Sequence, residues 1–273
     1  MIEQNEHFTS PKTTARIAGL LYLLLIVTGF FSLRYVPSRL IEWDNAETTF
    51  NNIVASEALF RLSILAGIIG YTGFLILPIV LYKLLNHVNK TFAFGMVMLA
   101  VVSVPLSYAY LLDKFDVLTL THKSNFLNVF AANQLHAQVL LQLHYYDNGI
   151  LLASIFWGLW LFPLGYLVYK SGFLPKIIGV FLMVGCFGYL IDFLGHYFMS
   201  DKYGGMGISN FVGLPGSLGE LAICLWLLIV GVKKNGYQLI EFEVAGLNHY
   251  FNQAIYVLII QPLLFASGII IRQ

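Results

Sequence analysis

Two acidic residues, Asp192 and Glu220, lie inside long apolar stretches of this sequence. Placing an ionisable side chain in hydrocarbon costs several kcal/mol, so such residues usually face a protein interior or a water-filled cavity. A carboxylate in that position can bind a cation, share a proton with a neighbouring group, or neutralise a basic side chain. These two residues are therefore the first candidates for a functional site.

Other titratable residues lie where the apolar stretches begin or end. A helix rises about 1.5 Å per residue, which puts Asp192 and Glu220 at similar depth in the same half of a membrane. His196 follows Asp192 by one turn, and Glu57 precedes Arg61 by four residues, a spacing that favours an ion pair. With Glu57 in support, we expect one outward-facing polar cluster of six residues: Arg61, His144, Asp147, Asp192, His196 and Glu220.

Three roles are open for this cluster. It could be purely structural, with Arg61 or a protonated histidine neutralising a carboxylate, or with Glu220 staying protonated. It could bind or transport a small polar or cationic ligand, or it could be the site of an acid–base or metal-dependent hydrolase. His144 and Asp147, like Asp192 and His196, are ligand types that zinc accepts, but such spacings occur easily by chance. We therefore assign no metal site, no cofactor and no catalytic residue, and favour a protein that is not an enzyme.

The apolar stretches themselves indicate a membrane protein. Apolar residues make up 58% of the sequence and charged residues 11%, against roughly a quarter charged in an ordinary soluble domain. A spanning helix needs about 20 mostly apolar residues. Six runs qualify, and a seventh is marginal in length and contains Pro262 at its centre. The six runs lie near 15–35, 60–84, 92–112, 146–169, 175–198 and 211–232, and the seventh lies near 254–271.

Continuous apolar runs predict helices, since the strands of a membrane barrel would alternate in polarity. The expected fold class is an all-α, polytopic transmembrane helical bundle with six spans and a marginal seventh. Membrane lipid is the expected partner. The net charge is +1 and no basic aromatic motif occurs, so we expect no nucleic-acid partner.

Loop charges predict the orientation of the bundle. The short links 83–91 and 170–176 contain lysines and no acidic residue, which is typical of cytoplasmic loops. The links 34–59 and 113–145 contain acidic residues and are expected outside. Within the second, 124–145 is expected to form an amphipathic helix that runs into the fourth span. The expected location is therefore a cell membrane, crossed several times, with the N-terminus in the cytoplasm.

Small residues share helix faces with the two buried acids. Gly185 lies on the same face as Asp192 in the fifth run, and Gly216 lies on the same face as Glu220 in the sixth. Membrane helices approach one another closely at small residues. Both carboxylates are therefore expected to point into the bundle and not towards lipid.

Several segments of the sequence carry a resemblance to one family. They are 15–22 (ARIAGLLY), 56–61 (SEALFR), 156–175 (FWGLWLFPLGYLVYKSGFLP), 188–192 (GYLID) and 219–221 (GEL). They resemble a bacterial family of small multi-pass membrane proteins catalogued as domain of unknown function four-three-eight-six. The likeness covers about 12–234 and implies a six-helix unit of unknown activity. We therefore divide the chain into a six-helix membrane domain, 1–234, and a tail with a marginal additional span, 235–273.

The function expected from the sequence is that of an integral membrane protein with a polar pocket that faces outward and binds a small ligand or a lipid headgroup. The alternatives are a membrane-embedded metal-dependent or acid–base hydrolase, and a polar cluster that only stabilises the fold. The resemblance does not choose among them, because the activity of the family is unknown.

Overall fold

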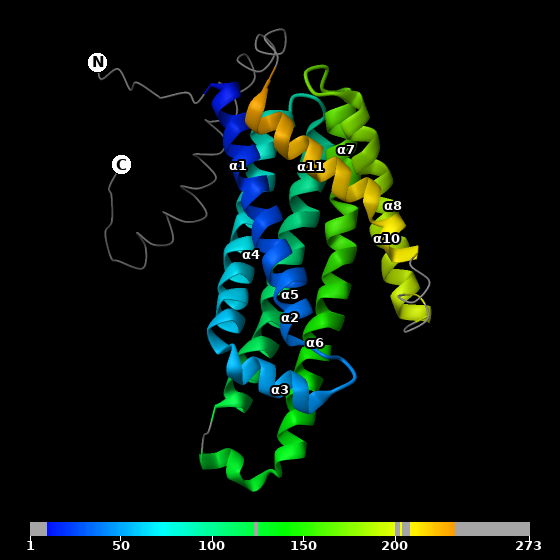
Figure 1. Cartoon of the computed structure of the whole chain (residues 1–273). Coiled ribbons are helices and arrows are strands. Elements are labelled where there is room, and N and C mark those ends of the chain that lie inside the picture. The colour runs from blue at the N-terminus through cyan, green and yellow to red at the C-terminus, as the bar shows by residue number, and fades with distance from the viewer. Residues whose placement is uncertain (1–9, 123–124, 200–202, 204–207, 233–273) are drawn as a thin grey trace, which may run out of the picture.

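The computed structural model describes residues 10–122, 125–199, 203 and 208–232, and every regular element within these ranges is helical. The all-α bundle expected from the sequence is therefore confirmed. The elements are shown in Figure 1. They are α1 (Pro11–Gly29), the π-helix η1 (Phe30–Tyr35), α2 (Pro37–Leu40), α3 (Ala46–Ala55), α4 (Glu57–Leu85), α5 (Lys90–Thr121), the 3-10 helix η2 (Asn125–Val129), α6 (Ala132–Leu159), α7 (Leu161–Lys170), α8 (Lys176–Met199), α10 (Ile208–Val212) and α11 (Leu214–Ile229).

Five helical stretches of the described chain are long and apolar enough to cross a membrane, judged by length and composition. They coincide with the first five runs predicted from the sequence. Their bounds are Pro11–Leu40, Glu57–Leu85, Lys90–Thr121, Ala132–Lys170 and Lys176–Met199.

The sixth predicted span, 211–232, is shorter in the structure than a single spanning helix. Its apolar helix α11 has 16 residues and follows the five-residue helix α10 after a break at Gly213. Pro215 accounts for the break, because a proline in the first turn has no N–H to bond the carbonyl of Phe211, four residues earlier. The seventh predicted span, 254–271, lies outside the described residues.

The segment 113–145 is mostly helical, and α6 runs from it into the fourth predicted span as expected. α5 continues to Thr121, and α6 already starts at Ala132. Val117 and Val139 of this region are fully buried, so its apolar side chains extend the core of the bundle. The charged residues that interrupt the apolar run had concealed this extension.

Asparagine side chains set the starts of two helices. Asn45 accepts a hydrogen bond from the N–H of Thr48 at 2.9 Å, and Asn89 accepts one from the N–H of Phe92 at 3.0 Å. Each bond satisfies one of the N–H groups that a helix start leaves free. The chain therefore turns just before α3 and just before α5.

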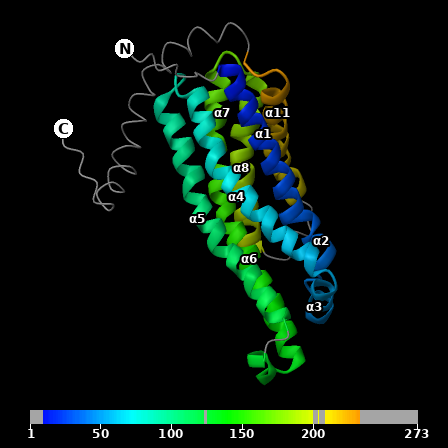
Figure 2. The ribbon, with the colours of Figure 1, turned by 90° about the vertical axis from the view of Figure 1, so that its left-hand side faces the viewer.

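The long helices lie side by side, and α3 lies across one end of the bundle (Figures 1 and 2). α1 packs against α4 and α11, α5 packs against α6, and α8 packs against α7 and α11. α5 and α6 extend beyond the other helices at the end where α3 lies (Figure 2). The links from α4 to α5 and from α7 to α8 lie at the opposite end, where α1 starts (Figure 1).

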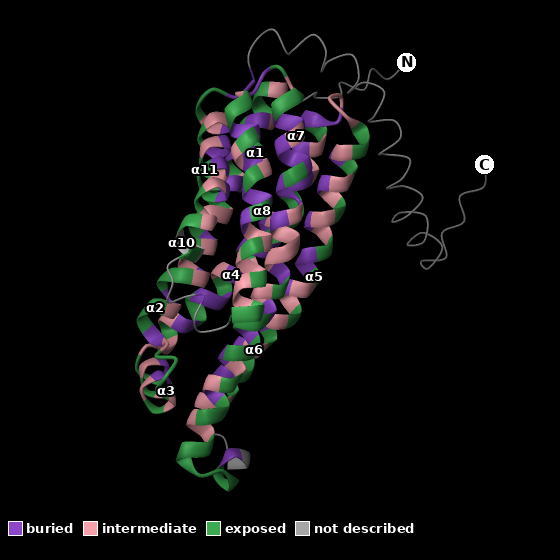
Figure 3. Ribbon diagram, turned by 90° about the vertical axis from the view of Figure 1, so that its right-hand side faces the viewer, coloured by how far each residue is buried: buried purple, intermediate pink, exposed green. Residues whose placement is uncertain are grey.

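Two hydrophobic cores follow one another along the bundle. One includes Leu81 and Trp160, and the other, nearer to α3, includes Phe60. The outer surface is also apolar: Leu20 of α1 and Phe30 of η1 are 59% and 62% exposed, and exposed positions run along all the long helices (Figure 3). The site described below lies where the two cores meet.

Candidate functional site

The structure divides the six residues of the predicted cluster among three places. Arg61 lies at the start of α4. Four residues gather on α6 and α8 towards the α3 end of the bundle: His144, Asp147, Asp192 and His196. Glu220 lies by itself on α11.

Arg61 forms the predicted ion pair with Glu57. Its Nε atom lies 2.6 Å from Glu57 Oε1, and His122 Nε2 lies 3.9 Å from the same oxygen. The side chains of Arg61 and Glu57 are 51% and 39% exposed. Among the described residues Arg61 forms no ion pair with Asp192 or Glu220. The pair therefore secures the start of α4 and does not neutralise either acid.

Asp192 and His196 form the centre of the second group. His196 Nδ1 lies 3.6 Å from an Asp192 carboxylate oxygen and 2.9 Å from the Asp192 main-chain carbonyl. Asp147 on α6 is close enough to His144 and His196 to interact with both electrostatically. The His144 ring packs against Trp43, with 4.8 Å between the ring centroids. The packing of α6 against α8 thus gathers these four titratable residues.

The second group lacks the arrangement of a metal centre. Within the described ranges, no three histidine, cysteine, aspartate or glutamate side chains are grouped so that they could hold a metal ion. His196 Nδ1 also lies within hydrogen-bond distance of a carbonyl of its own helix, and the His144 ring packs on Trp43. The group can therefore stabilise the contact between α6 and α8, and the geometry offers no metal-ligand set.

Glu220 lies between α1, α8 and α11. The hydroxyl of Tyr22 donates to Glu220 Oε1 at 3.4 Å, and Tyr189 of α8 also lies within interaction distance of the carboxylate. Close helix packing brings these elements together, since a Cβ atom on Gly185 would overlap the Cα atom of Gly216. α8 and α11 therefore meet at two glycines one turn before Glu220, on the faces that the sequence predicted.

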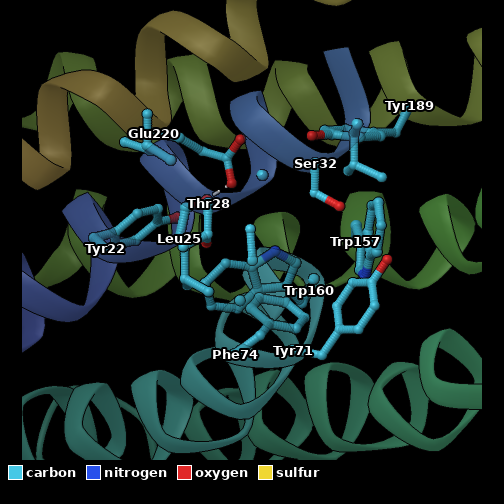
Figure 4. Close-up of a pocket in the computed structure, with 16 residues that line it drawn as sticks. Tyr22, Leu25, Thr28, Ser32, Tyr71, Phe74, Trp157, Trp160, Tyr189 and Glu220 are labelled. Atoms are coloured by element: carbon cyan, nitrogen blue, oxygen red, sulfur yellow. Dashed lines mark hydrogen bonds between the residues drawn. The ribbon is translucent and has the colours of Figure 1, made fainter. Parts of the chain in front are cut away.

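A cavity of about 200 Å³ opens beside Glu220 (Figure 4). Its wall is built from α1, η1, α4, α6, α8 and α11, and from one tryptophan at the junction of α6 and α7. Glu220 is the one acidic or basic side chain among the wall residues of the described chain. Six aromatic side chains contribute to the wall: Tyr22, Tyr71, Phe74, Trp157, Trp160 and Tyr189.

The aromatic side chains of the wall pack against one another. Trp160, which is 1% exposed, meets Phe74 edge to face at 5.0 Å and Tyr22 at 6.1 Å between ring centroids. The rings of Trp157 and Tyr71 lie 6.4 Å apart. Aromatic pairs of this kind add stability beyond the area that they bury. The aromatic part of the cavity wall is thus preformed.

Three hydroxyl groups of the wall are already engaged in hydrogen bonds. Thr28 Oγ1 donates to a carbonyl of its own helix at 2.7 Å, and Ser32 Oγ donates to the carbonyl of Ser63 at 2.8 Å. The hydroxyls of Tyr71 and Tyr146 are hydrogen-bonded to each other at 3.3 Å. The wall therefore offers a ligand mainly ring faces and the carboxylate of Glu220.

Sequence analysis missed Lys114, which lies inside the bundle on α5. The side chain is 2% exposed, and its Nζ atom donates to the main-chain carbonyl of Ser32 at 3.3 Å. The ammonium group also lies 4.3 Å from the centroid of the Tyr146 ring. Leu111 and Leu118, three residues before and four after, are buried on the same helix face. That spacing was the available signal that Lys114 points inward.

The π-helix η1 supplies the carbonyl that Lys114 binds. The N–H of Val36 donates to the carbonyl of Phe31 at 3.1 Å, five residues earlier, as in a π-helix. The next residue, Pro37, has no N–H to donate. The carbonyl of Ser32 is therefore left without a main-chain donor, and Lys114 supplies one.

A second cavity, of about 70 Å³, lies beside Lys114. Asp147 and Trp43 contribute to its wall, so Asp147 of the second group shares this space with the buried lysine. Leu33 of η1 lines both cavities. The π-helix therefore forms part of the boundary between the Glu220 cavity and the Lys114 cavity.

These features define a class: an all-α bundle of apolar helices, long enough to cross a membrane, around a buried carboxylate and an aromatic cavity. The chain belongs to the family described as Domain of unknown function (DUF4386), whose family model matches residues 17–231. The resemblance predicted from the sequence is confirmed, while the bacterial origin stays a prediction.

One relative with curated data is also of unknown activity. An uncharacterized protein of Archaeoglobus fulgidus is 38% identical over 82 residues, which make up 30% of this chain and 46% of that protein. The alignment thus spans less than half the length of that relative. No solved structure matches the chain. The function must therefore be argued from the site.

Proposed function

We propose that this protein is a multi-pass membrane protein of the binding or transport type, and that the cavity beside Glu220 holds a small ligand or a lipid headgroup. The five long apolar helices support a membrane location. So does the outer surface, where Leu20 and Val27 of α1 and Phe30 of η1 are all more than half exposed. In water such side chains would form an apolar patch of a size that soluble monomers rarely expose.

The proposed orientation has the N-terminus in the cytoplasm. The two short links that contain lysines and no acid lie at the end of the bundle where α1 starts (Figure 1). Short basic loops are typical of the cytoplasmic side. The cavity is lined by α1 and η1 from Tyr22 to Leu33, which is mostly the later part of the stretch Pro11–Leu40. The cavity then lies towards the outside, as the sequence predicted for the pocket.

The observation that supports a binding role is that Glu220 has few hydrogen-bond donors and no basic partner among the described residues. A carboxylate has about four acceptor positions, and the protein donors near Glu220 are the hydroxyls of Tyr22, at 3.4 Å, and of Tyr189. No basic residue of the described ranges forms an ion pair with it. An unpaired buried charge is destabilising, so without a cation the Glu220 carboxyl group would be expected to stay protonated. A cationic ligand would supply the partner that the described residues do not.

Filling the cavity tests the proposal. Gly29 lies in the cavity wall, and a Cβ atom built there meets no atom within 4 Å, so Gly29→Leu places a side chain in open space. Gly95→Leu on α5 is the matched control, because a Cβ atom there also meets nothing within 4 Å and Gly95 is not part of either cavity wall. Both variants exchange a helical glycine for leucine and gain similar helix propensity.

The readout is the melting temperature of the purified protein in maltoside detergent, with choline chloride, glycine, glycerol or sodium acetate added, and in lipid nanodiscs. A ligand that binds the folded state raises the melting temperature. We expect at least one probe or lipid to stabilise the wild type and Gly95→Leu but not Gly29→Leu. If none of them separates the two leucine variants, the binding function is wrong and the polar groups serve the fold.

A further inference from the structure

We propose that the cavity beside Glu220 binds an alkylammonium group, with the carboxylate as its counter-ion and the aromatic rings as its walls. This inference rests on the binding function proposed above and names the chemical class of its ligand. A free alkylammonium ion and the ammonium headgroup of a membrane lipid share this chemistry, and the experiment below separates the two sources.

The charge of the wall is the first argument. Glu220 is its one charged side chain among the described residues, and no basic residue there pairs with it. An anionic ligand would meet a like charge in surroundings of low dielectric constant, where Coulomb repulsion is strong. A neutral ligand would leave the carboxylate without a counter-ion. A cation satisfies the carboxylate and is itself neutralised.

The ring faces are the second argument. A cation within about 6 Å of a ring centroid is attracted by the face of the ring, most strongly by tryptophan, and quaternary ammonium ligands are recognised in this way by aromatic cages. Figure 4 shows Tyr22 and Trp160 near Glu220, and Trp157 and Tyr71 further along the same space. The wall therefore presents aromatic surface on several sides of a position next to the carboxylate.

The oxygen atoms of the wall favour an ammonium group over a metal ion. Glu220 is the one carboxylate of the wall, and the other side-chain oxygens of the described wall residues belong to neutral hydroxyl groups such as those of Thr28 and Ser32. Ca²⁺ takes six to eight oxygen ligands and Mg²⁺ requires near-ideal octahedral coordination, which this wall does not provide. An alkylated ammonium needs few or no hydrogen bonds, so it matches the wall better than a metal ion does.

The volume of the cavity limits the size of the ammonium compound that it can hold. At about 200 Å³, the space exceeds the cavity of about 150 Å³ that binds benzene in an engineered protein. It is smaller than the sites of about 300–1,000 Å³ that hold drug-sized molecules. Trimethylammonium compounds such as choline are in the range that fits.

The test compares choline with 3,3-dimethyl-1-butanol, which has nearly the same shape but carries no charge. Isothermal titration calorimetry on the full-length protein in maltoside detergent gives both affinities. We expect choline to bind about tenfold more tightly than the alcohol, and Glu220→Gln to weaken choline binding about tenfold while the alcohol changes little. Equal affinities of the two probes for the wild type would overturn the inference, as would full choline affinity in Glu220→Gln. If Glu220→Gln does not fold, the wild-type comparison still decides.

Two substitutions of Trp157 test the contribution of the ring faces to choline binding. Trp157 lies in the wall, and Trp157→Phe keeps a ring face that Trp157→Leu removes. We expect choline affinity to fall in the order wild type, Trp157→Phe, Trp157→Leu, with a total loss of about three- to tenfold, and the alcohol to show no such order. A choline affinity that is the same in all three proteins would rule out the aromatic contribution and, with it, the proposed mode of binding.

Nanodiscs identify the source of the ammonium group. If it is a lipid headgroup, wild-type protein in phosphatidylcholine discs should bind added choline at least tenfold more weakly than in phosphatidylglycerol discs, because the lipid competes. If it is a free ion, the two discs should give the same affinity at high salt, where the negative surface potential of phosphatidylglycerol is screened. In either case Gly29→Leu should lose choline binding and Gly95→Leu should keep it. Choline binding that survives Gly29→Leu would place the ammonium group elsewhere and overturn the inference.

The two proposals can fail separately. If choline and the neutral alcohol bind equally and Gly29→Leu abolishes both, the cavity is a binding site and only its ligand class is wrong. If no probe of any charge and no lipid responds to Gly29→Leu, the binding function itself is wrong.

Discussion

At the scale of single residues, Lys114 shows how a charge can be accommodated inside an apolar bundle. Its ammonium group donates to a carbonyl that the π-helix and Pro37 leave without a main-chain donor, and it lies against the Tyr146 ring. A buried acceptor without a donor costs about 1–3 kcal/mol. The lysine therefore completes the hydrogen bonding of η1, the segment that borders both cavities.

Lys114→Met should destabilise the protein by about 1–3 kcal/mol, because the carbonyl of Ser32 loses its donor. Pro37→Ala restores an N–H five residues after Ser32, so the same lysine change should cost less in that background. Unfolding in detergent measures the four members of this cycle. Lys170→Met, at an exposed lysine, is the control and should be nearly neutral. An equal loss with Pro37 and with Ala at that position would contradict the role given to Lys114.

Arg61→Ala should change the melting temperature little, because the ion pair with Glu57 is half exposed and water screens it. Glu57→Ala should have a similarly small effect. The measurement is thermal unfolding in detergent, with the wild type alongside. A large loss for Arg61→Ala alone would mean that the arginine reaches a buried carboxylate, which the structure does not show among its described residues.

At the scale of elements, the contact of α8 with α11 determines where Glu220 lies. A Cβ atom on Gly185 would overlap Gly216, whereas one on Gly95 meets open space. Gly185→Ala should therefore destabilise by about 1–3 kcal/mol through overpacking. Gly95→Ala should stabilise by up to about 1 kcal/mol through helix propensity. Chemical or thermal unfolding gives both values, and a stabilising Gly185→Ala would show that the helices do not touch there.

Local patterns in the sequence predict the elements better than they predict the site. Apolar runs gave the first five spans, because length and hydropathy are properties of one segment. The glycines on the faces of Asp192 and Glu220 correctly indicated close helix packing, because the residues that share one helix face also belong to one segment. The extension of α5 was missed because charged residues interrupt its apolar run, although Val117 is buried. The π-helix was missed because it depends on which N–H reaches which carbonyl near Pro37.

The site required distances between helices, which spacing along one chain does not give. Their similar depth in the membrane predicted that Arg61, Asp192 and Glu220 lie together. In the structure Arg61 forms an ion pair with Glu57, and Glu220 accepts a hydrogen bond from Tyr22. The aromatic wall comes from helices far apart in the sequence, so no local motif contains it. In the sequence each of these aromatic residues looks like an ordinary core residue. Only their arrangement around one carboxylate in the structure indicates a binding site.

At the scale of the whole molecule, the orientation in the membrane decides from which side the cavity is reached. We expect Lys170→Cys to react with an impermeant maleimide only after the cells are permeabilised, because the link after α7 is expected in the cytoplasm. Glu47→Cys on α3 should react in intact cells. Both positions are exposed, and the native Cys186 and Cys224 are buried, so they give little background. The reverse pattern of labelling would invert the proposed topology.

The most direct test of the central claim is an experimental structure of the wild-type protein with bromocholine, the (2-bromoethyl)trimethylammonium ion, whose bromine is located by anomalous scattering. We expect a bromine peak in the cavity, with the trimethylammonium group next to the Glu220 carboxylate and against the rings of Tyr22 and Trp160. An empty cavity at saturating bromocholine, or a bromine peak only outside the bundle, would contradict it.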